Sequence, residues 1–175
     1  MKFIIIAAFI LCSLNSPTWA ADVPFSNGTL QLTIPQSFTP LTEEEILLKF
    51  PRNSKPPLVS YADSRRANTI AVTWSELNPK LTPSGLPSFK LFMKKNLERS
   101  IPNLKWVDHG LKQISDRHWV YLESRVPGID VEIHNLMFFT DVKGDMLGIN
   151  FTAPESNWEQ YKLEVESIIA GLAVK

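Results

Sequence analysis

The stretch HWVYLESRVPGIDVEIHNLMFFTDVKGDMLGINFT, residues 118–152, decides the fold. It contains three runs of alternating polar and apolar residues, separated by turn residues around Pro127-Gly128 and Lys143-Gly144. Alternation with a period of two is typical of half-buried strands, and short connections that contain glycine are typical of hairpins. The stretch therefore predicts a three-stranded antiparallel meander.

Charge pairing predicts the register of the first hairpin. A four-residue loop at 127–130 places Arg125 opposite Glu132, which is a favourable pair. The same register places Glu123 opposite His134. A loop of only two residues would place Glu123 opposite Glu132, where like charges repel, so we predict the longer loop.

The second hairpin is predicted to turn at residues 142–144. Gly144 can adopt the left-handed backbone that a bulged three-residue turn requires. In this register Phe139 lies beside Leu147 on the same face of the sheet.

These registers sort the meander into two faces. The first face is apolar throughout and carries Val120, Leu122, Val126, Val131, Ile133, Met137, Phe139, Leu147, Ile149 and Phe151. The second carries Trp119, Tyr121, Leu136 and Phe138 at one end and Glu123, Arg125, Glu132 and His134 at the other. A sheet with apolar side chains on both faces needs cover on both. We therefore expect an α+β fold, a three-layer α-β-α sandwich around a central antiparallel sheet.

Two segments with helical periodicity can supply the covering layers. The first lies between residues 84 and 101 and the second between 156 and 172, with predicted N-caps at Ser84 and Ser156 and a capping box formed by Ser156 and Glu159. Their apolar stripes are Leu86, Phe89, Phe92, Met93, Leu97 and Ile101, and Trp158, Tyr161, Val165, Ile168, Ile169 and Leu172.

The N-terminal half is predicted to add strands and one short helix. Strands are expected at 29–34, 58–61 and 68–74, where apolar residues alternate. Thr42 and Glu45 have the spacing of a capping box, so a helix is expected from there to Phe50.

The first 20 residues are typical of an export signal. Lys2 precedes an apolar run, and Thr18-Trp19-Ala20 has the small-x-small pattern of a cleavage site, so we predict cleavage after Ala20 or Ala21. Residues 21–175 would then form a single domain. The apolar run is shorter than the roughly 20 residues that span a bilayer, so no permanent membrane anchor is expected. The predicted location is periplasmic or secreted, in a bacterium.

Composition excludes several classes of function. The chain carries 18 basic and 18 acidic residues, which argues against a dedicated nucleic-acid binder, because such a protein needs a basic face. Its single cysteine, Cys12, lies in the predicted signal. Thiol catalysis and thiolate metal sites are therefore excluded for the mature chain.

The order of elements resembles that of a known family. The segments 28–35, 38–45 and 49–51, followed by Tyr61 and 69–74, are similar to the PsbP/Mog-type superfamily and especially to its DcrB-type exported bacterial members. The later helices and hairpin follow in the same order. The resemblance implies a non-enzymatic module for binding or assembly, and its motifs carry no catalytic residue.

No signature of catalysis accompanies these patterns. The sequence has no G-x-S-x-G elbow and no glycine-rich phosphate loop. His134 with Glu123 and Glu132 could in principle bind a divalent ion, but a ladder of ion pairs explains the same residues, so no metal and no cofactor are predicted.

We therefore predict an accessory protein that binds another protein. The candidate binding surface is Trp119, Tyr121, Glu123, Arg125, Glu132 and His134. One alternative is a periplasmic carrier of a small hydrophobic ligand. The space that holds this ligand would be lined by Phe89, Phe92, Met93, Phe138 and Phe139. A weaker alternative is a hydrolase whose site is too dispersed to see in a sequence.

Overall fold

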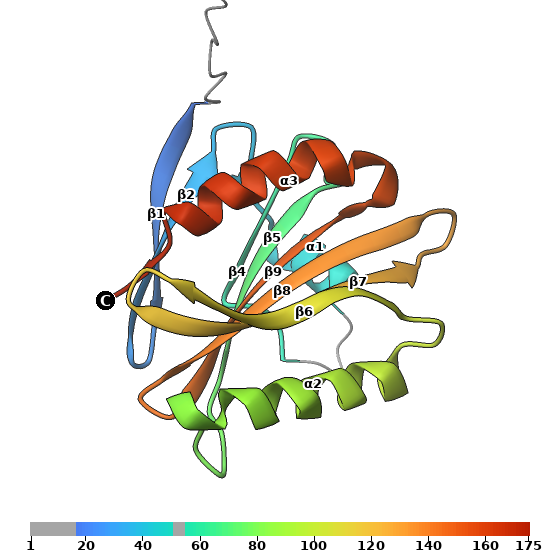
Figure 1. Ribbon diagram of the computed structural model, residues 1–175. Helices are drawn as coiled ribbons and strands as arrows, with labels where there is room; N and C mark the ends of the chain where they lie inside the picture. The colour runs from blue at the N-terminus through green and yellow to red at the C-terminus, as the bar shows by residue number, and fades with distance from the viewer. Residues whose placement is uncertain (1–16, 51–54) are drawn as a thin grey trace, which may run out of the picture.

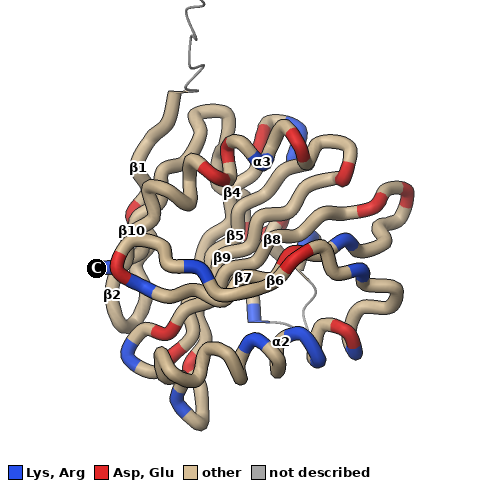
Figure 2. The backbone as a smooth tube through the Cα atoms, viewed as in Figure 1, with Lys and Arg blue, Asp and Glu red and all other residues tan. Residues whose placement is uncertain are grey.

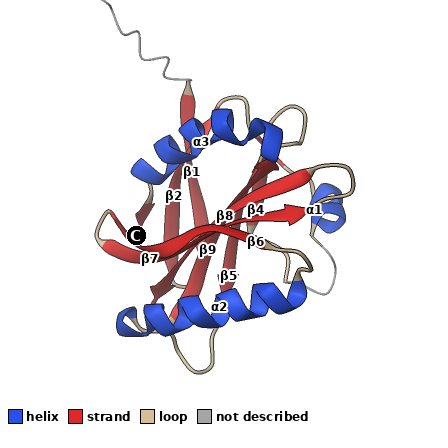
Figure 3. Cartoon of the chain, turned by 45° about the vertical axis from the view of Figure 1, so that its right-hand side comes forward, coloured by secondary structure: helices blue, strands red, loops and turns tan. Residues whose placement is uncertain are grey.

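A computed structural model describes residues 17–50 and 55–175. Seven strands form one antiparallel sheet in the order β3-β4-β5-β9-β8-β7-β6, and three strands form a smaller sheet in the order β1-β2-β10. Helix α3 lies across one face of the large sheet and α2 across the other (Figure 1, Figure 3). The predicted three-layer α+β architecture is confirmed.

The elements follow one another in chain order. They are β1 (Thr18–Phe25), β2 (Gly28–Pro35), β3 (Thr39–Pro40), α1 (Glu43–Lys49), β4 (Val59–Ala62), β5 (Thr69–Ser75), the 3₁₀ turn η1 (Pro83–Gly85), α2 (Leu86–Ser100), β6 (Lys105–Ile114), β7 (Arg117–Pro127), β8 (Glu132–Val142), β9 (Asp145–Pro154), α3 (Glu155–Ala170) and β10 (Ala173–Val174). In the described part of the chain, none of these helices has the length and apolar content needed to cross a bilayer.

The core is divided by the large sheet into two clusters. The larger cluster lies under α3 and includes the buried side chains Leu30, Leu32 and Ile34 of β2, as their alternation predicts. The smaller cluster lies under α2 and includes Leu122 and Phe139. The two clusters together leave little apolar surface of β7 to solvent, which is why both helices are required.

The register of the β7–β8 hairpin differs from the prediction by two residues. Val126 pairs with Ile133 and Arg125 with His134, and the turn is closed by a bond from the Gly128 amide to the Val131 carbonyl. Because the shift is an even number, every side chain stays on its predicted face. The predicted pairs of Arg125 with Glu132 and of Glu123 with His134 across the strands are wrong.

The register of the β8–β9 hairpin differs by one residue, and this changes the faces. Val142 pairs with Asp145 across a two-residue turn in which Lys143 and Gly144 have φ values of 52° and 90°. Two left-handed residues are typical of a type I′ turn. Leu147, Ile149 and Phe151 consequently lie under α3, opposite the predicted face, in the cluster that contains Trp119.

The helix starts also differ in detail. The capping box of Thr42 and Glu45 is present, but α3 begins directly after β9 at Glu155, without a side-chain cap, so the predicted box at Ser156 is wrong. At η1 the cap is Thr82, whose hydroxyl accepts a hydrogen bond from the Gly85 amide, in place of Ser84.

Strand β1 includes the residues of the predicted cleavage site. Thr18, Trp19 and Ala20 are exposed and pair with β2, and Ala21 is the first buried residue of the strand. Residues 1–16 of the predicted signal lie outside the described residues. A cut after Ala20 would leave the buried part of β1 in place, and the cleavage remains a prediction.

Asp145 joins three parts of the chain at the start of β9. Its carboxylate accepts hydrogen bonds from Asn27, from the Leu77 amide and from Lys80. The Lys80 ammonium and then the Leu77 amide lower the pKa of this buried carboxyl below its usual value. A lowered folded-state pKa means that the ionised form stabilises the fold above the unfolded pKa and that this contribution is lost as the pH falls through the folded pKa.

We therefore expect Asp145→Asn to lower the melting temperature at pH 7 and to flatten its acid dependence. In thermal melts between pH 7 and about pH 3, the difference between the two proteins should begin to shrink once the pH falls below the ordinary carboxyl value of about 3.9 and should continue to shrink toward the lower folded pKa. Asp22→Asn, an exposed change on β1, serves as the control. A constant difference between Asp145→Asn and wild type across this range would contradict the assignment.

Candidate functional site

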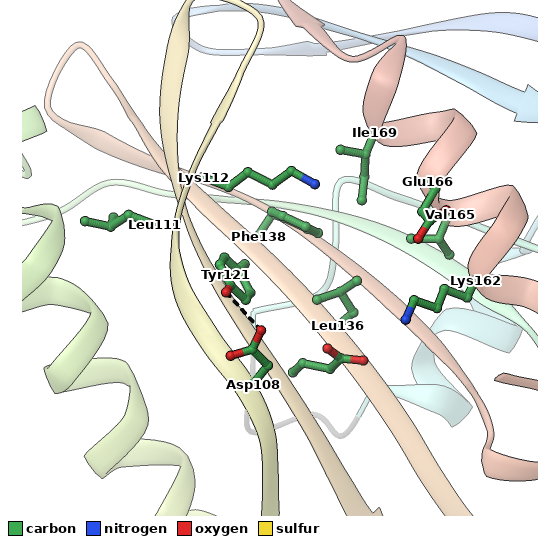
Figure 4. A pocket seen from close by; sticks show the side chains of 11 residues that line it. Asp108, Leu111, Lys112, Tyr121, Leu136, Phe138, Lys162, Val165, Glu166 and Ile169 are labelled. Atoms are coloured by element: carbon green, nitrogen blue, oxygen red, sulfur yellow. Dashed lines mark hydrogen bonds between the residues drawn. The ribbon is translucent and has the colours of Figure 1, made fainter. Parts of the chain in front are cut away.

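A groove lies between α3 and the edge of the large sheet, with a volume of about 330 Å³ (Figure 4). Its floor is apolar and is built from β8 and α3: Leu136, Phe138, Val165 and Ile169. Its walls are charged: Asp108 and Lys112 from β6, Glu123 from β7, and Lys162 and Glu166 from α3. This combination of an apolar floor with a few polar groups is the usual composition of a binding site.

Tyr121 forms the wall of the groove on the β6 side. Its ring lies across Gly110, where a Cβ atom would come within 2.7 Å of Tyr121 Cε1. The Tyr121 hydroxyl donates a hydrogen bond to Asp108 Oδ2, 3.0 Å away. Burial and then the Asp108 carboxylate raise the pKa of Tyr121, so the phenol remains a neutral donor. Residues 108–110 lie inside β6, where the glycine makes room for the ring.

The cationic groups of the groove lie on opposite walls. Lys112 extends from β6 and Lys162 from α3 over the apolar floor (Figure 4). Among the described residues neither lysine forms an ion pair. The carboxylates of Asp108 and Glu123 are engaged by Tyr121 and His134. The two lysines are therefore the cations available to an incoming group.

A largely buried network of polar side chains joins Glu123, which lines the groove, to β8 and α3. His134 is 2% exposed, and its ring lies flat on Trp158 with centroids 3.8 Å apart. Its Nε2 is 2.8 Å from Glu123 Oε1 and its Nδ1 is 2.7 Å from Glu155 Oε2. Both ring nitrogens of His134 are therefore occupied by carboxylate oxygens from two different elements, β7 and α3.

This network has a structural role and offers no reactive group to a substrate. Both nitrogens of His134 are occupied and the ring is covered by Trp158. Arg125 adds an ion pair with Glu155, with Nε and Oε1 3.2 Å apart. The network therefore attaches the first residue of α3 to β7 and β8, and so sets the position of one wall of the groove.

The predicted binding surface is divided by this arrangement. Tyr121 and Glu123 line the groove, whereas Trp119 is fully buried in the core and His134 is buried in the network. Arg125 pairs with Glu155, and Glu132 pairs with Lys105 of β6 at 2.9 Å, an interaction that lowers the pKa of Glu132. The ligand set of His134, Glu123 and Glu132 does not assemble, and the described residues contain no group of three His, Cys, Asp or Glu side chains that could hold a metal ion.

Tyr121 and Glu123 were predicted as site residues, whereas the sequence patterns did not indicate the other charged residues of the walls, Asp108, Lys112, Lys162 and Glu166. Lys162 and Glu166 lie beside the apolar stripe of α3, and nothing in the stripe shows which strand they face. Asp108 and Lys112 flank Gly110 with a period of two, and that alternation around a glycine was the available signal for a strand with close packing.

Comparison with known proteins was made for families, for curated proteins and for solved structures. No family model matches the chain, and no curated protein matches it. Among solved structures it is similar to cyanobacterial PsbP (CyanoP) from Synechocystis sp. PCC 6803, with a TM-score of 0.66, 16% identity, and coverage of 91% of this chain and 94% of that one.

Two further solved structures share the architecture. One is LpqN, involved in cell envelope biogenesis of Mycobacterium tuberculosis, with a TM-score of 0.56, 12% identity, and coverage of 90% of this chain and 91% of that one. The other is PA94 of Pseudomonas aeruginosa, a protein of unknown function, with a TM-score of 0.55, 12% identity, and coverage of 89% and 97%. The chain therefore has the PsbP-like fold, as the resemblance of its elements to PsbP/Mog-type proteins predicts.

Proposed function

We propose that the chain is an exported accessory protein without catalytic activity that binds a protein partner in the groove between α3 and β6–β8. The observation that carries the proposal is the groove itself, in which an apolar floor lies between two lysines that have no ion pair among the described residues. The N-terminal segment typical of export and the similarity in fold to the cell-envelope protein LpqN support a location in the envelope.

The chemistry of the groove defines the partner. Leu136 and Phe138 would receive one apolar side chain, and Lys112 and Lys162 would pair with acidic residues on either side of it. A buried apolar anchor within a charged rim is the common arrangement of a protein interface, in which the anchor provides affinity and the charges provide orientation. The expected partner segment is therefore acidic, with an apolar residue at its centre.

Site-specific photocrosslinking in the native host tests this proposal. A photoreactive residue at position 112 or 162 should give the same discrete protein adduct, whereas positions 163 and 175, which are exposed outside the groove, should not. The identified partner should then bind the purified protein, and Lys112→Glu/Lys162→Glu should weaken that binding at least about tenfold. Adducts that are equal at all four positions would contradict the proposal, and so would turnover of an ester, peptide or glycan.

The alternative of a hydrophobic-ligand carrier, as the sequence suggested it, does not fit the geometry. Phe138 lies under α3, whereas Phe89 and Phe139 pack against each other on the α2 side of the sheet, with centroids 6.0 Å apart. Phe92 is 58% exposed. These side chains therefore cannot line one cavity.

A further inference from the structure

The two outer layers of the sandwich carry opposite charge. Helix α2 has four basic residues and one acidic residue: Lys90, Lys94, Lys95, Arg99 and Glu98. Helix α3 has one basic residue and four acidic residues: Lys162, Glu155, Glu159, Glu164 and Glu166. Basic residues follow α2 along its length, although the whole chain is balanced at 18 and 18 (Figure 2). The molecule is therefore polarised from one layer to the other.

Helix α2 also presents large apolar side chains to solvent. Leu91 is 56% exposed and Phe92 is 58% exposed, although the periodicity of the helix places Phe92 in its predicted apolar stripe. Lys95 and Arg99, both exposed, follow on the same outer side within two turns. The views in Figures 1 and 3 agree that α2 is the outermost layer on its side of the sheet.

We infer that α2 docks the protein on an anionic membrane surface. Leu91 and Phe92 would enter the boundary between headgroups and acyl chains, and Lys95 and Arg99 would contact the anionic headgroups, as in amphipathic helices that lie in the plane of a membrane. Lys90 and Lys94, which are half-buried, add to the positive potential at the same level.

A membrane fits this surface better than a protein partner does. Two hollows among the described residues, the groove and a second one beside Tyr161 and Glu164, are lined by other elements than α2. A protein partner would need a pocket of its own shaped to receive Leu91 and Phe92, whereas the boundary of a bilayer accepts side chains that project from a convex helix. The acidic α3 would point away from anionic lipid, so the groove beside α3 would remain open. This inference is independent of what the groove binds.

Sedimentation with lipid vesicles tests the inference on the full chain as exported. The protein should bind vesicles of phosphatidylglycerol and phosphatidylcholine more tightly than vesicles of phosphatidylcholine alone, and binding should weaken with salt. Lys95→Glu/Arg99→Glu should weaken binding by about thirtyfold or more, because each basic residue near an anionic surface contributes to the affinity. Leu91→Ser/Phe92→Ser should weaken it by about tenfold, and Leu163→Ser/Lys175→Glu, outside α2, should leave it unchanged.

A second measurement locates the contact. The fluorescence of the tryptophan added by Phe92→Trp should be quenched by vesicles with brominated acyl chains. The fluorescence of the tryptophan added by Leu163→Trp on α3 should not be quenched. Any N-terminal segment that remains attached is the same in wild type and in the α2 variants, so the comparison between these proteins isolates the contribution of α2. Equal affinity for both vesicles, α2 variants that bind like wild type, or capture by an acidic protein surface without capture by vesicles would each overturn the inference.

Discussion

Replacing Trp119 with alanine is expected to lower the free energy of unfolding by about 3 to 5 kcal/mol. Trp119 is 0% exposed and lies in the cluster between the large sheet and α3. Its removal would leave a cavity that the neighbouring strands cannot close, because β7 is held by β6 and β8 on both sides. Such a loss is a large part of the ~5 to 15 kcal/mol that stabilises a typical domain. Urea unfolding at neutral pH measures it.

Two further tryptophan changes make this experiment specific. Trp106→Ala removes a half-buried ring at the edge of the sheet and should cost roughly 1 to 2 kcal/mol. Trp119→Phe keeps most of the volume and removes an indole N–H that has no hydrogen-bond partner among the described residues, so it should retain most of the stability. If Trp119→Ala cost no more than Trp106→Ala, α3 would not cover this residue in solution.

Replacing His134 with leucine is expected to cost about 2 to 4 kcal/mol. The change keeps an apolar group against Trp158 but removes both ring nitrogens, one of which contacts Glu123 and the other Glu155. Glu123, whose side chain is 15% exposed, would then lose its histidine partner, Glu155 would keep only Arg125, and the first turn of α3 would lose its attachment to β8. Urea unfolding measures the loss, and partner binding in the groove should weaken with it.

A compensating variant tests the reason for this loss. His134→Leu combined with Glu123→Gln and Glu155→Gln removes the histidine and both carboxylates together and leaves Arg125, whose side chain is 42% exposed, in contact with water. Replacing all the partners of a buried polar group is much less costly than removing one of them. The triple variant should therefore recover at least half of the lost stability. Equal instability of the single and triple variants would show that shape, and not the stranded carboxylates, causes the loss.

Local periodicity was sufficient for the three helices, for β2, β4, β5, β7, β8 and β9, and for most faces, but it did not predict β1, β3, β6 or β10. The alternation of Leu30, Leu32 and Ile34 and the stripe from Trp158 to Ile169 are buried as predicted. Phe92 is the exception in α2: its position matches the period of the helix, but its side chain projects to the open side of α2. The apolar stripe covers a range of directions around the helix axis, and the sheet contacts only the side chains in part of that range.

Neither hairpin register was predicted correctly, and the predicted faces were retained only where the error was an even number of residues. Charge pairing misplaced β8 by two residues and preserved the faces, whereas the type I′ turn at Lys143 and Gly144 shifted β9 by one and reversed them. The turn depends on Lys143 adopting a positive φ, which a lysine rarely does and which no pattern in the sequence signals.

The sequence by itself determined the three-layer architecture, because apolar residues on both faces of a strand must be covered on both sides. Only the tertiary structure decided the groove. Its walls come from β6 and α3, which are separated by some fifty residues and meet because His134 holds Glu155 beside Glu123. The same packing buried Trp119 and left Tyr121 at the surface. Local patterns specify which face of an element is apolar, but the distance between two elements is set by the side chains of both.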